Sequence, residues 1–188
     1  MQHYLDLQLR ADPEFPAQQL MDALYAKLHR ALVELGNERL AVTFPKMVAT
    51  GARRGLGDRL RVIGPEADLS ALQALPWLQG MRDHVEQTAM APVPTGAQLG
   101  RLVRVQAKSG VDRMRRRAMR RHGLTEAQAQ ERLPDAAAER LDLPHLSLRS
   151  ASTGQQYLLF LRFEAAAAPV SGVFNTFGLG AAATVPWF

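Results

Sequence analysis

The side chains best suited to bind another molecule are gathered in one short basic segment. Residues 98–123 carry nine basic side chains and one acidic one, whereas residues 1–97 carry ten and eleven, and residues 124–188 carry four and six. The formal net charge of +5 therefore arises from this segment alone, and eight of its nine cations are arginine. Arginine offers a forked pair of donors that fits phosphate oxygens. We expect the segment to bind a polyanion.

The arginines also share a direction when the segment is drawn as a helix. At about 100° per residue, four of them lie on one face, Arg121 lies at its border, and Arg115 and His122 point elsewhere. A solvated helix face is the plain alternative, but only Asp112 interrupts the run, and arginine outnumbers lysine. Nucleic acid is favoured over a membrane surface, which needs large apolar residues on the opposite face. The face consists of Arg113, Arg116, Arg117 and Arg120.

Charge does not settle which nucleic acid is bound. Arginine helices enter the DNA major groove, whereas that groove is deep and narrow in regular A-form RNA. An RNA partner would need a short stem whose groove opens at an end or loop. A DNA-binding regulator is the other possibility, but such proteins ordinarily show dimer symmetry, and no zipper or second recognition helix is evident.

Metal-dependent chemistry finds no support in the sequence. The five histidines form no pair with metal-ligand spacing, the acidic residues are scattered, and cysteine is absent. No cofactor-binding motif occurs either, so we expect neither a metal nor a cofactor.

Two positions are candidates for metal-free chemistry. His29 lies roughly 120° from the centre of the apolar face of its helix, so it is not a core histidine, although an ordinary exposed polar residue would look the same. Ser150, Ser152 and Thr153 precede a glycine in a turn that suits phosphate contact, but serine-rich turns are common. Tyr157 could stack on a base, yet an aromatic residue in a strand more often belongs to the core.

The elements that would position these residues follow from periodicity. Alternation over residues 3–9 predicts a half-buried strand, and leucines at helical spacing predict a helix over residues 18–35 that ends at Gly36. The order β-α-β-β-α-β over residues 1–95 predicts a ferredoxin-like domain. Its remaining elements are strands at 39–45, 59–64 and 84–93 and a helix at 66–81, perturbed at Pro76.

The pattern of residues 96–188 predicts a smaller α+β domain that carries the arginine-rich helix. A strand at 101–108 precedes this helix at 110–121. Thr125 and Gln128 have the spacing of a capping box at the start of the next helix. Two strands at 145–150 and 155–164 flank the serine turn, and an edge strand with a packed tail is expected at the end.

The chain's composition sets its class. It has 188 residues, of which 47% are hydrophobic, enough for a buried core. No signal peptide and no apolar run of membrane-spanning length is evident. We expect a cytoplasmic protein without a membrane partner.

Short, uncommon sequence strings in a fixed order also show a resemblance to a known protein family, and they are spread over nearly the whole chain. HYLD, DPEFP, KLH, RVQAKS, RxRRRxMRRH, LDLP, LRSxSTGQ and the terminal VPWF are similar to the type I-F CRISPR RNA-processing endoribonucleases, a branch of antiviral defence. The resemblance implies cleavage of precursor RNA 3′ of the repeat hairpin, without metal, followed by retention of the hairpin. The ribose 2′-OH attacks the adjacent phosphate, which leaves a 2′,3′-cyclic phosphate and a 5′-OH. It also implies a monomer on RNA that joins other subunits of a surveillance complex.

The resemblance assigns roles to individual residues. His29 would be the general base toward the 2′-OH, and Ser150 would hold that hydroxyl. Arg104 and Gln106 would read base edges, and Tyr157 would stack under the terminal base pair of the stem. Phosphate contacts would come from Arg113, Arg116, Arg117, Arg120, Arg121 and His122. Independently of the resemblance, the serine turn suggests Ser152 and Thr153 as further phosphate contacts.

One departure from the family pattern concerns Phe177, which stands where the family has an active-site tyrosine. Its ring can still position His29 by packing, but a hydroxyl hydrogen bond is lost. We expect cleavage to persist. The alternative is a non-catalytic subunit that binds the RNA hairpin, but the presence of both His29 and Ser150 favours the enzyme.

Overall fold

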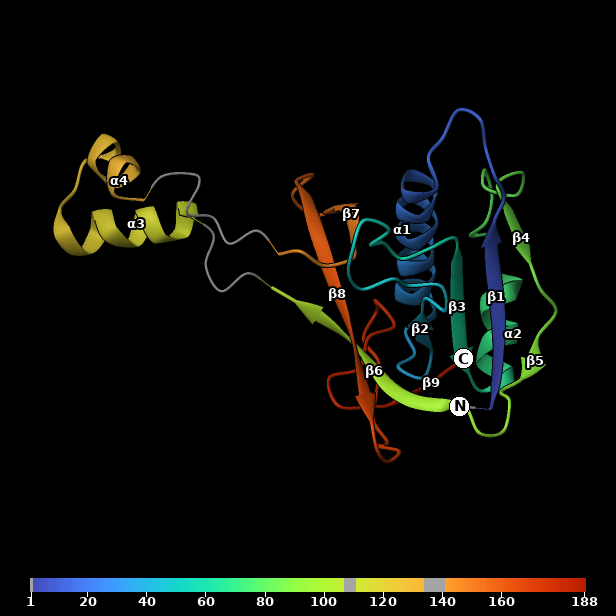
Figure 1. Cartoon of the computed structure of the whole chain (residues 1–188). Helices are drawn as coiled ribbons and strands as arrows, with labels where there is room; N and C mark the ends of the chain where they lie inside the picture. Colours follow the sequence, from blue (N-terminus) through green and yellow to red (C-terminus); the bar gives the residue numbers. More distant parts are fainter. Residues whose placement is uncertain (1, 107–110, 134–140) are drawn as a thin grey trace. The chain divides into compact units, whose positions relative to one another are not determined.

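The computed structural model of the chain describes residues 2–106, 111–133 and 141–188, and for residues 111–113 the backbone only. The chain forms two compact units, one of Met1–Arg104 with Leu143–Phe188 and one of Val105–Asp142 (Figure 1). No helix within the described residues is both long and apolar enough to cross a membrane.

The first unit contains an antiparallel sheet whose central strand is β1 (His3–Leu9). The strand order is β2-β3-β1-β4, and the short β5 pairs with the other end of β1. The predicted elements of residues 1–95 occur in the predicted order. They are α1 (Ala17–Leu35), β2 (Ala41–Thr43), β3 (Arg59–Gly64), α2 (Glu66–Ala74), β4 (Val85–Gln87) and β5 (Ala91–Pro92).

Three predicted boundaries were wrong. The helix predicted to Met81 ends at Ala74, because Leu75 precedes a proline and takes the extended conformation that proline imposes on its neighbour. The strand predicted at 84–93 is two short strands, β4 and β5, that pair with different parts of β1. The strand predicted at 39–45 is confined to three residues.

The second sheet of this unit is also antiparallel in its registered pairs and has the order β7-β8-β6-β9. The strand predicted from residue 101 begins at Gln98, and its predicted last residues 107 and 108 lie outside the described residues. The expected edge strand at the end of the chain is present as β9. The four strands are β6 (Gln98–Val105), β7 (His145–Arg149), β8 (Gln156–Ala166) and β9 (Val185–Trp187).

The second unit holds two helices, α3 (Val111–His122) and α4 (Glu126–Arg132). The helix predicted at 110–121 is thus present, although Gly110 lies outside the described residues. The predicted capping box at α4 is confirmed, since the Thr125 hydroxyl accepts from the Gln128 N–H and the Gln128 side chain accepts from the Thr125 N–H. Arg115 Nε donates to the Leu133 carbonyl at 2.8 Å, which ties α3 to the end of α4.

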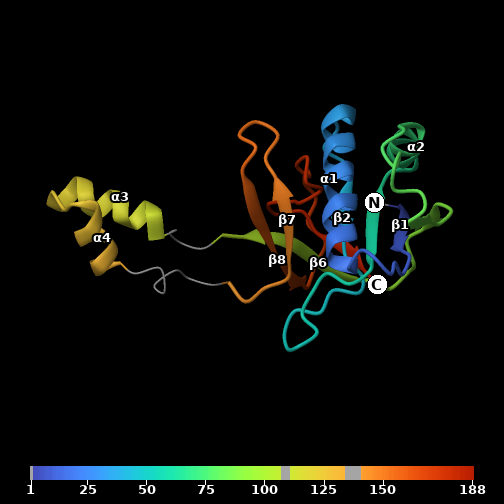
Figure 2. The same cartoon turned by 90° about the horizontal axis from the view of Figure 1, so that it is seen from above.

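Helix α1 lies between the two sheets of the first unit in both views (Figures 1 and 2). It packs against β1 on one side and against β7 on the other. Its buried face is therefore wider than the leucine stripe in the sequence suggests, because Met21 and Tyr25 are buried as well as the leucines.

The opposite face of the first sheet is covered by the end of the chain. Phe174, Ala183 and Val185 form a second buried cluster with Ala41 of β2 and Ile63 of β3. On β1, Asp6 is buried on this side as well, while Tyr4 and Gln8 are half-buried, so the polar face is less open than the alternation predicts.

A buried ion pair forms on this covered face. Asp6 and Arg61 lie directly opposite each other on β1 and β3, and both are about 95% buried, with exposed fractions of 5% and 4%. Arg61 donates from Nε to Asp6 Oδ1 at 2.6 Å and from its NH2 group to Oδ2 at 2.8 Å. Its remaining NH1 group donates to the main-chain oxygen of Phe188 at 2.7 Å. The pair thus joins the sheet to the end of the chain.

We predict that Arg61→Met lowers the free energy of unfolding by about 3–5 kcal/mol, because the buried Asp6 carboxylate would lose both short hydrogen bonds to a guanidinium and keep only the 3.7 Å contact with Arg59. Guanidinium denaturation measures the loss. The matched control is Arg59→Met, which removes a more exposed arginine 3.7 Å from the same carboxylate and should cost less than about 1 kcal/mol. Equal losses in the two variants would contradict the assignment.

Candidate active site

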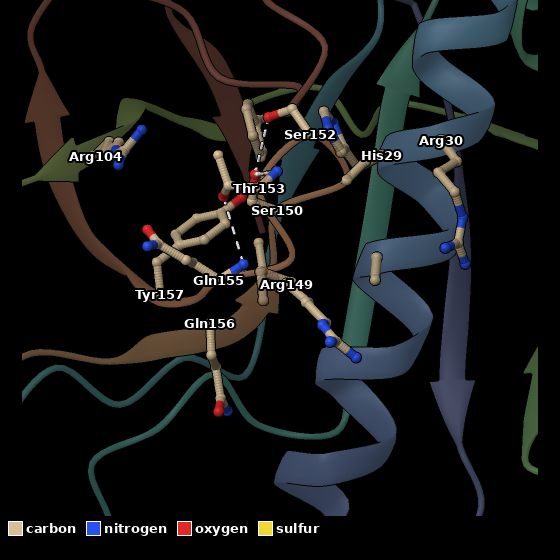
Figure 3. A pocket seen from close by; sticks show the side chains of 14 residues that line it. His29, Arg30, Arg104, Arg149, Ser150, Ser152, Thr153, Gln155, Gln156 and Tyr157 are labelled. Atoms are coloured by element: carbon tan, nitrogen blue, oxygen red, sulfur yellow. Dashed lines mark hydrogen bonds between the residues drawn. The ribbon is translucent and has the colours of Figure 1, made fainter.

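A cleft of about 570 Å³ lies in the first unit (Figure 3). Five of its lining residues come from five different segments: His29 from α1, Arg104 from β6, Ser150 from the β7–β8 turn, Tyr157 from β8 and Phe177 from the loop before β9. Residues that are far apart in the sequence thus share one cavity.

The contact between α1 and β7 explains how His29 and Ser150 come to the same cleft. The Asp22 carboxylate on α1 accepts from the backbone N–H of Ser147 at 3.0 Å, and Gln18 donates to the His145 carbonyl at 3.0 Å. Burial raises the pKa of the Asp22 carboxyl, and the hydrogen bond from Ser147 opposes that rise. His29 lies seven residues after Asp22, about two helical turns, so it remains on the side of α1 that meets β7.

The ring of half-buried His29 is held by two contacts. Its Nδ1 lies 2.8 Å from the Thr176 carbonyl oxygen, and its face stacks on Phe177 with centroids 4.0 Å apart and an interplanar angle of 10°. A carbonyl can only accept, so Nδ1 carries the hydrogen in this bond. In the neutral ring, Nε2 is then the nitrogen that can accept a proton.

The loop that supplies these contacts is itself fixed. The Asn175 side-chain oxygen accepts from the N–H groups of Phe177 and Leu179, at 2.9 and 3.2 Å. The buried Tyr25 hydroxyl donates to the Phe177 carbonyl at 2.7 Å, and burial raises the pKa of Tyr25 far above its usual value, so the phenol stays protonated. Gly178 has φ +67°, and a Cβ there would overlap the Val42 side chain.

The serine turn presents several hydroxyls from one short segment. Ser150 Oγ accepts from the Thr153 N–H at 3.3 Å and lies 3.1 Å from Ser152 Oγ. Gly154 closes the turn with φ +68°, and Arg149 Nε donates to its carbonyl at 2.8 Å. Figure 3 shows Ser150, Ser152 and Thr153 grouped next to His29.

The remaining predicted residues divide between the two units. Exposed Arg104 and half-buried Tyr157 line the cleft, and both act electrostatically on the Tyr25 hydroxyl. Gln106 and the α3 residues belong to the second unit. The Arg113 side chain lies outside the described residues, whereas exposed side chains are found at Gln106, Arg116, Arg117, Arg120, Arg121 and His122.

Other polar groups at the cleft were missed by the sequence analysis. Arg30, Arg149 and Gln155 line it beside the predicted residues, and their only signal was adjacency to His29 and Ser150. The role of the Thr176 carbonyl could not be predicted from the sequence, because every residue type has a backbone carbonyl.

The cleft combines a proton acceptor, hydroxyl groups and guanidinium groups. Such a set can move a proton from a hydroxyl and bind a phosphate at the same time. Among residues 2–106, 111–133 and 141–188, no group of three or more histidine, aspartate or glutamate side chains is placed to hold a metal ion.

Comparison with known proteins gives full-length matches. The family model described as CRISPR-associated protein (Cas_Csy4) matches residues 4–188. The chain is 48% identical to the CRISPR-associated endonuclease Cas6/Csy4 of Pseudomonas aeruginosa (strain UCBPP-PA14), with 100% of both chains covered. It is 42% identical to the protein of that name from Escherichia coli (strain UTI89 / UPEC), again over 100% of both.

A weaker likeness was found to a solved structure described as "An RAMP protein binding different RNA substrates". The alignment covers 98% of each chain at 11% identity, with a TM-score of 0.37. A likeness this low supports no inference about the present chain.

We predict that the neutral His29 ring carries its proton on Nδ1, and that Asn175→Ala weakens this preference by releasing the loop that holds the Thr176 carbonyl. The ¹⁵N shifts of the ring nitrogens distinguish the tautomers. Asn37→Ala, which changes an asparagine in the loop after α1, is the control and should leave the His29 shifts in place. An unchanged tautomer in Asn175→Ala would show that the side chain does not set the ring.

Proposed function

We propose that this chain, which belongs to the Cas_Csy4 family of CRISPR-associated proteins, is an endoribonuclease that cuts precursor CRISPR RNA on the 3′ side of the repeat hairpin. The observation that carries the proposal is the joint lining of one cleft by His29 and Ser150, with His29 Nδ1 engaged by the Thr176 carbonyl. The full-length relatives, named endonucleases, agree with this reading.

The proposed reaction uses only groups of this chain and of the RNA. His29 Nε2 takes the proton of the 2′-OH upstream of the cut, and the 2′-oxygen attacks the adjacent phosphorus. The bond from phosphorus to the 5′-oxygen breaks, which leaves a 2′,3′-cyclic phosphate. The 5′-oxygen takes up a proton, for which protonated His29 is a donor, and leaves as a 5′-OH. Ser150 Oγ orients the 2′-OH for in-line attack.

Recognition of the hairpin would fall to residues around the cleft and on α3. Arg104 and Gln106 have the donor geometry to read guanine and adenine edges, respectively. Tyr157 would stack on the terminal base pair of the stem, while Ser152 and Thr153 contact phosphates. The exposed arginines of α3 would grip the stem in its groove and retain the cleaved product.

We also propose a division of the chain into two domains. We infer a ferredoxin-like domain over residues 1–95 that carries His29, and its support is the β2-β3-β1-β4 order with the β-α-β-β-α-β sequence of elements. Residues 96–188 would form the RNA-binding domain with α3 and the serine turn. We further propose that the chain acts as a monomer on its RNA and joins other subunits of a type I-F surveillance complex.

A hairpin-binding subunit without cleavage activity is the alternative, and the observation in its favour is Phe177. A phenylalanine supplies the stack on His29 but no hydroxyl. The Thr176 carbonyl already holds Nδ1, so the ring is positioned without that hydroxyl. We therefore favour the enzyme.

We predict that His29→Ala lowers the cleavage rate at least 100-fold in excess chelator, because the proton acceptor is lost, while affinity for the hairpin stays within about twofold. Gel assays of cleavage and fluorescence anisotropy measure the two effects. A 2′-deoxy sugar upstream of the cut should stop the wild-type chain as well. His3→Ala is the matched control and should cut normally. Retained cleavage by His29→Ala would refute the mechanism.

We predict that Arg117→Ala weakens hairpin binding and reduces the slope of log affinity against log salt by about 0.7–0.9, the loss of one phosphate contact. Titrations at several salt concentrations give both numbers. Arg132→Ala, an exposed arginine on the neighbouring helix α4, serves as the control and should leave the slope unchanged. A wild-type slope in Arg117→Ala would argue against groove contact by this face.

A further inference from the structure

The turn at residues 175–178 leaves two of its main-chain carbonyls to be satisfied from outside it. The Gly178 N–H donates to the Asn175 carbonyl at 2.8 Å, and this bond closes the turn. The carbonyls of the two central residues, Thr176 and Phe177, take no part in it. A main-chain carbonyl is an obligatory acceptor, so each of these two needs a donor from another part of the chain or from water.

Helix α1 supplies both donors. His29 Nδ1 lies 2.8 Å from the Thr176 carbonyl oxygen, and the Tyr25 hydroxyl donates to the Phe177 carbonyl at 2.7 Å. Tyr25 and His29 are four residues apart in the sequence, so they are neighbours on one side of the helix, one turn from each other. Two successive peptide groups of the 175–178 turn are therefore held by two successive turns of α1.

The two donors differ in what else they must do. In the proposed reaction the His29 ring moves protons, whereas Tyr25 is only 1% exposed and cannot touch the RNA. Burial raises the pKa of Tyr25 far above its usual value, so its hydroxyl stays a donor. The Tyr25 ring is fixed by stacking on Phe44, with centroids 6.0 Å apart and an interplanar angle of 30°. An immobile, protonated phenol is suited to hold a turn and unsuited to transfer protons.

We propose that Tyr25 is a positioning residue for the cleavage reaction. Its hydroxyl holds the Phe177 carbonyl, and through it the ring that stacks on His29 and the neighbouring Thr176 carbonyl that fixes Nδ1. The inference rests on the proposed function. Residue 177 lacks a hydroxyl of its own, but a hydroxyl from α1 reaches the main chain of the same residue. Without Tyr25, the bond from His29 would have to hold the turn as well as the ring.

The first test is single-turnover cleavage of a hairpin-bearing repeat RNA by Tyr25→Phe, which removes the hydroxyl and keeps the ring. We expect the rate to fall about 10- to 100-fold, because a small displacement of a catalytic group has an effect of this size. The affinity for the same RNA with a 2′-deoxy sugar upstream of the cut should stay the same, because Tyr25 is buried and makes no contact with RNA. The loss therefore falls on the rate and not on binding.

Val85→Ala is the control for a general loss of stability. Val85 is buried on β4, at the edge of the first sheet opposite to β2, and it is β2 that meets the turn, through the contact of Val42 with Gly178. The control should lower the thermal midpoint of unfolding and cut at the wild-type rate, at a temperature where both variants are folded. Equal slowing in Val85→Ala and Tyr25→Phe would overturn the positioning role.

The second test does not depend on activity. The ¹⁵N shifts of the His29 ring should show a smaller share of the Nδ1–H tautomer in Tyr25→Phe than in the wild type, and Val85→Ala should leave these shifts in place. Asn175→Ala releases the same turn from within. Combining it with Tyr25→Phe should therefore slow cleavage by less than the product of the two separate factors. An unchanged tautomer, or factors that multiply fully, would show that Tyr25 does not act through the turn.

The outcomes separate the two claims. A wild-type cleavage rate in Tyr25→Phe would overturn the positioning role and leave the proposed function standing. Failure of the wild-type chain to cut the hairpin RNA would overturn the proposed function, and with it the role of Tyr25 in that reaction.

Discussion

The structure of the first unit depends on how α1 is fixed between two sheets. The helix buries leucines against the first sheet, and the Asp22 carboxylate fastens it to the backbone of β7. A second hydrogen bond, from Gln18 to the His145 carbonyl, and the shared core of leucines on α1 and β7 act in the same direction, so the imidazole and the hydroxyls line one surface. One partly buried carboxylate, which gives up solvation to accept from a strand N–H, thus contributes to the contact that brings α1 and β7 together.

The sequence predicted most of the secondary structure, because leucine spacing on α1 and alternation in β1 are strong local signals. It could not predict that Phe174, Ala183 and Val185, from the far end of the chain, cover the second face of the sheet at β2 and β3. Asp6 lies on the polar side of the alternation in residues 3–9, yet it is buried. Its burial is possible only because Arg61 lies opposite it, and strand register is not visible in the sequence of either strand alone.

The candidate site was predicted unevenly for a comparable reason. Rare strings indicated the family, which the full-length matches confirm, and carried His29 and Ser150 with them. Helical geometry alone showed that His29 is not a core residue, and it gave no indication of a catalytic role. The contact that gives the imidazole a defined proton position is the Thr176 backbone carbonyl, and Phe177 holds the face of the ring by stacking.

The loop around Thr176 has a consequence for the timing of activity. Its hydrogen bond to His29 joins residues 147 positions apart, so the polypeptide must close a very long loop before the imidazole acquires its tautomer. On the ribosome, the first sheet and α1 emerge long before this loop does. A nascent chain that already displays His29 would hold an imidazole without its acceptor, and the fixed tautomer would arise only after residue 176 has been made and has folded against α1.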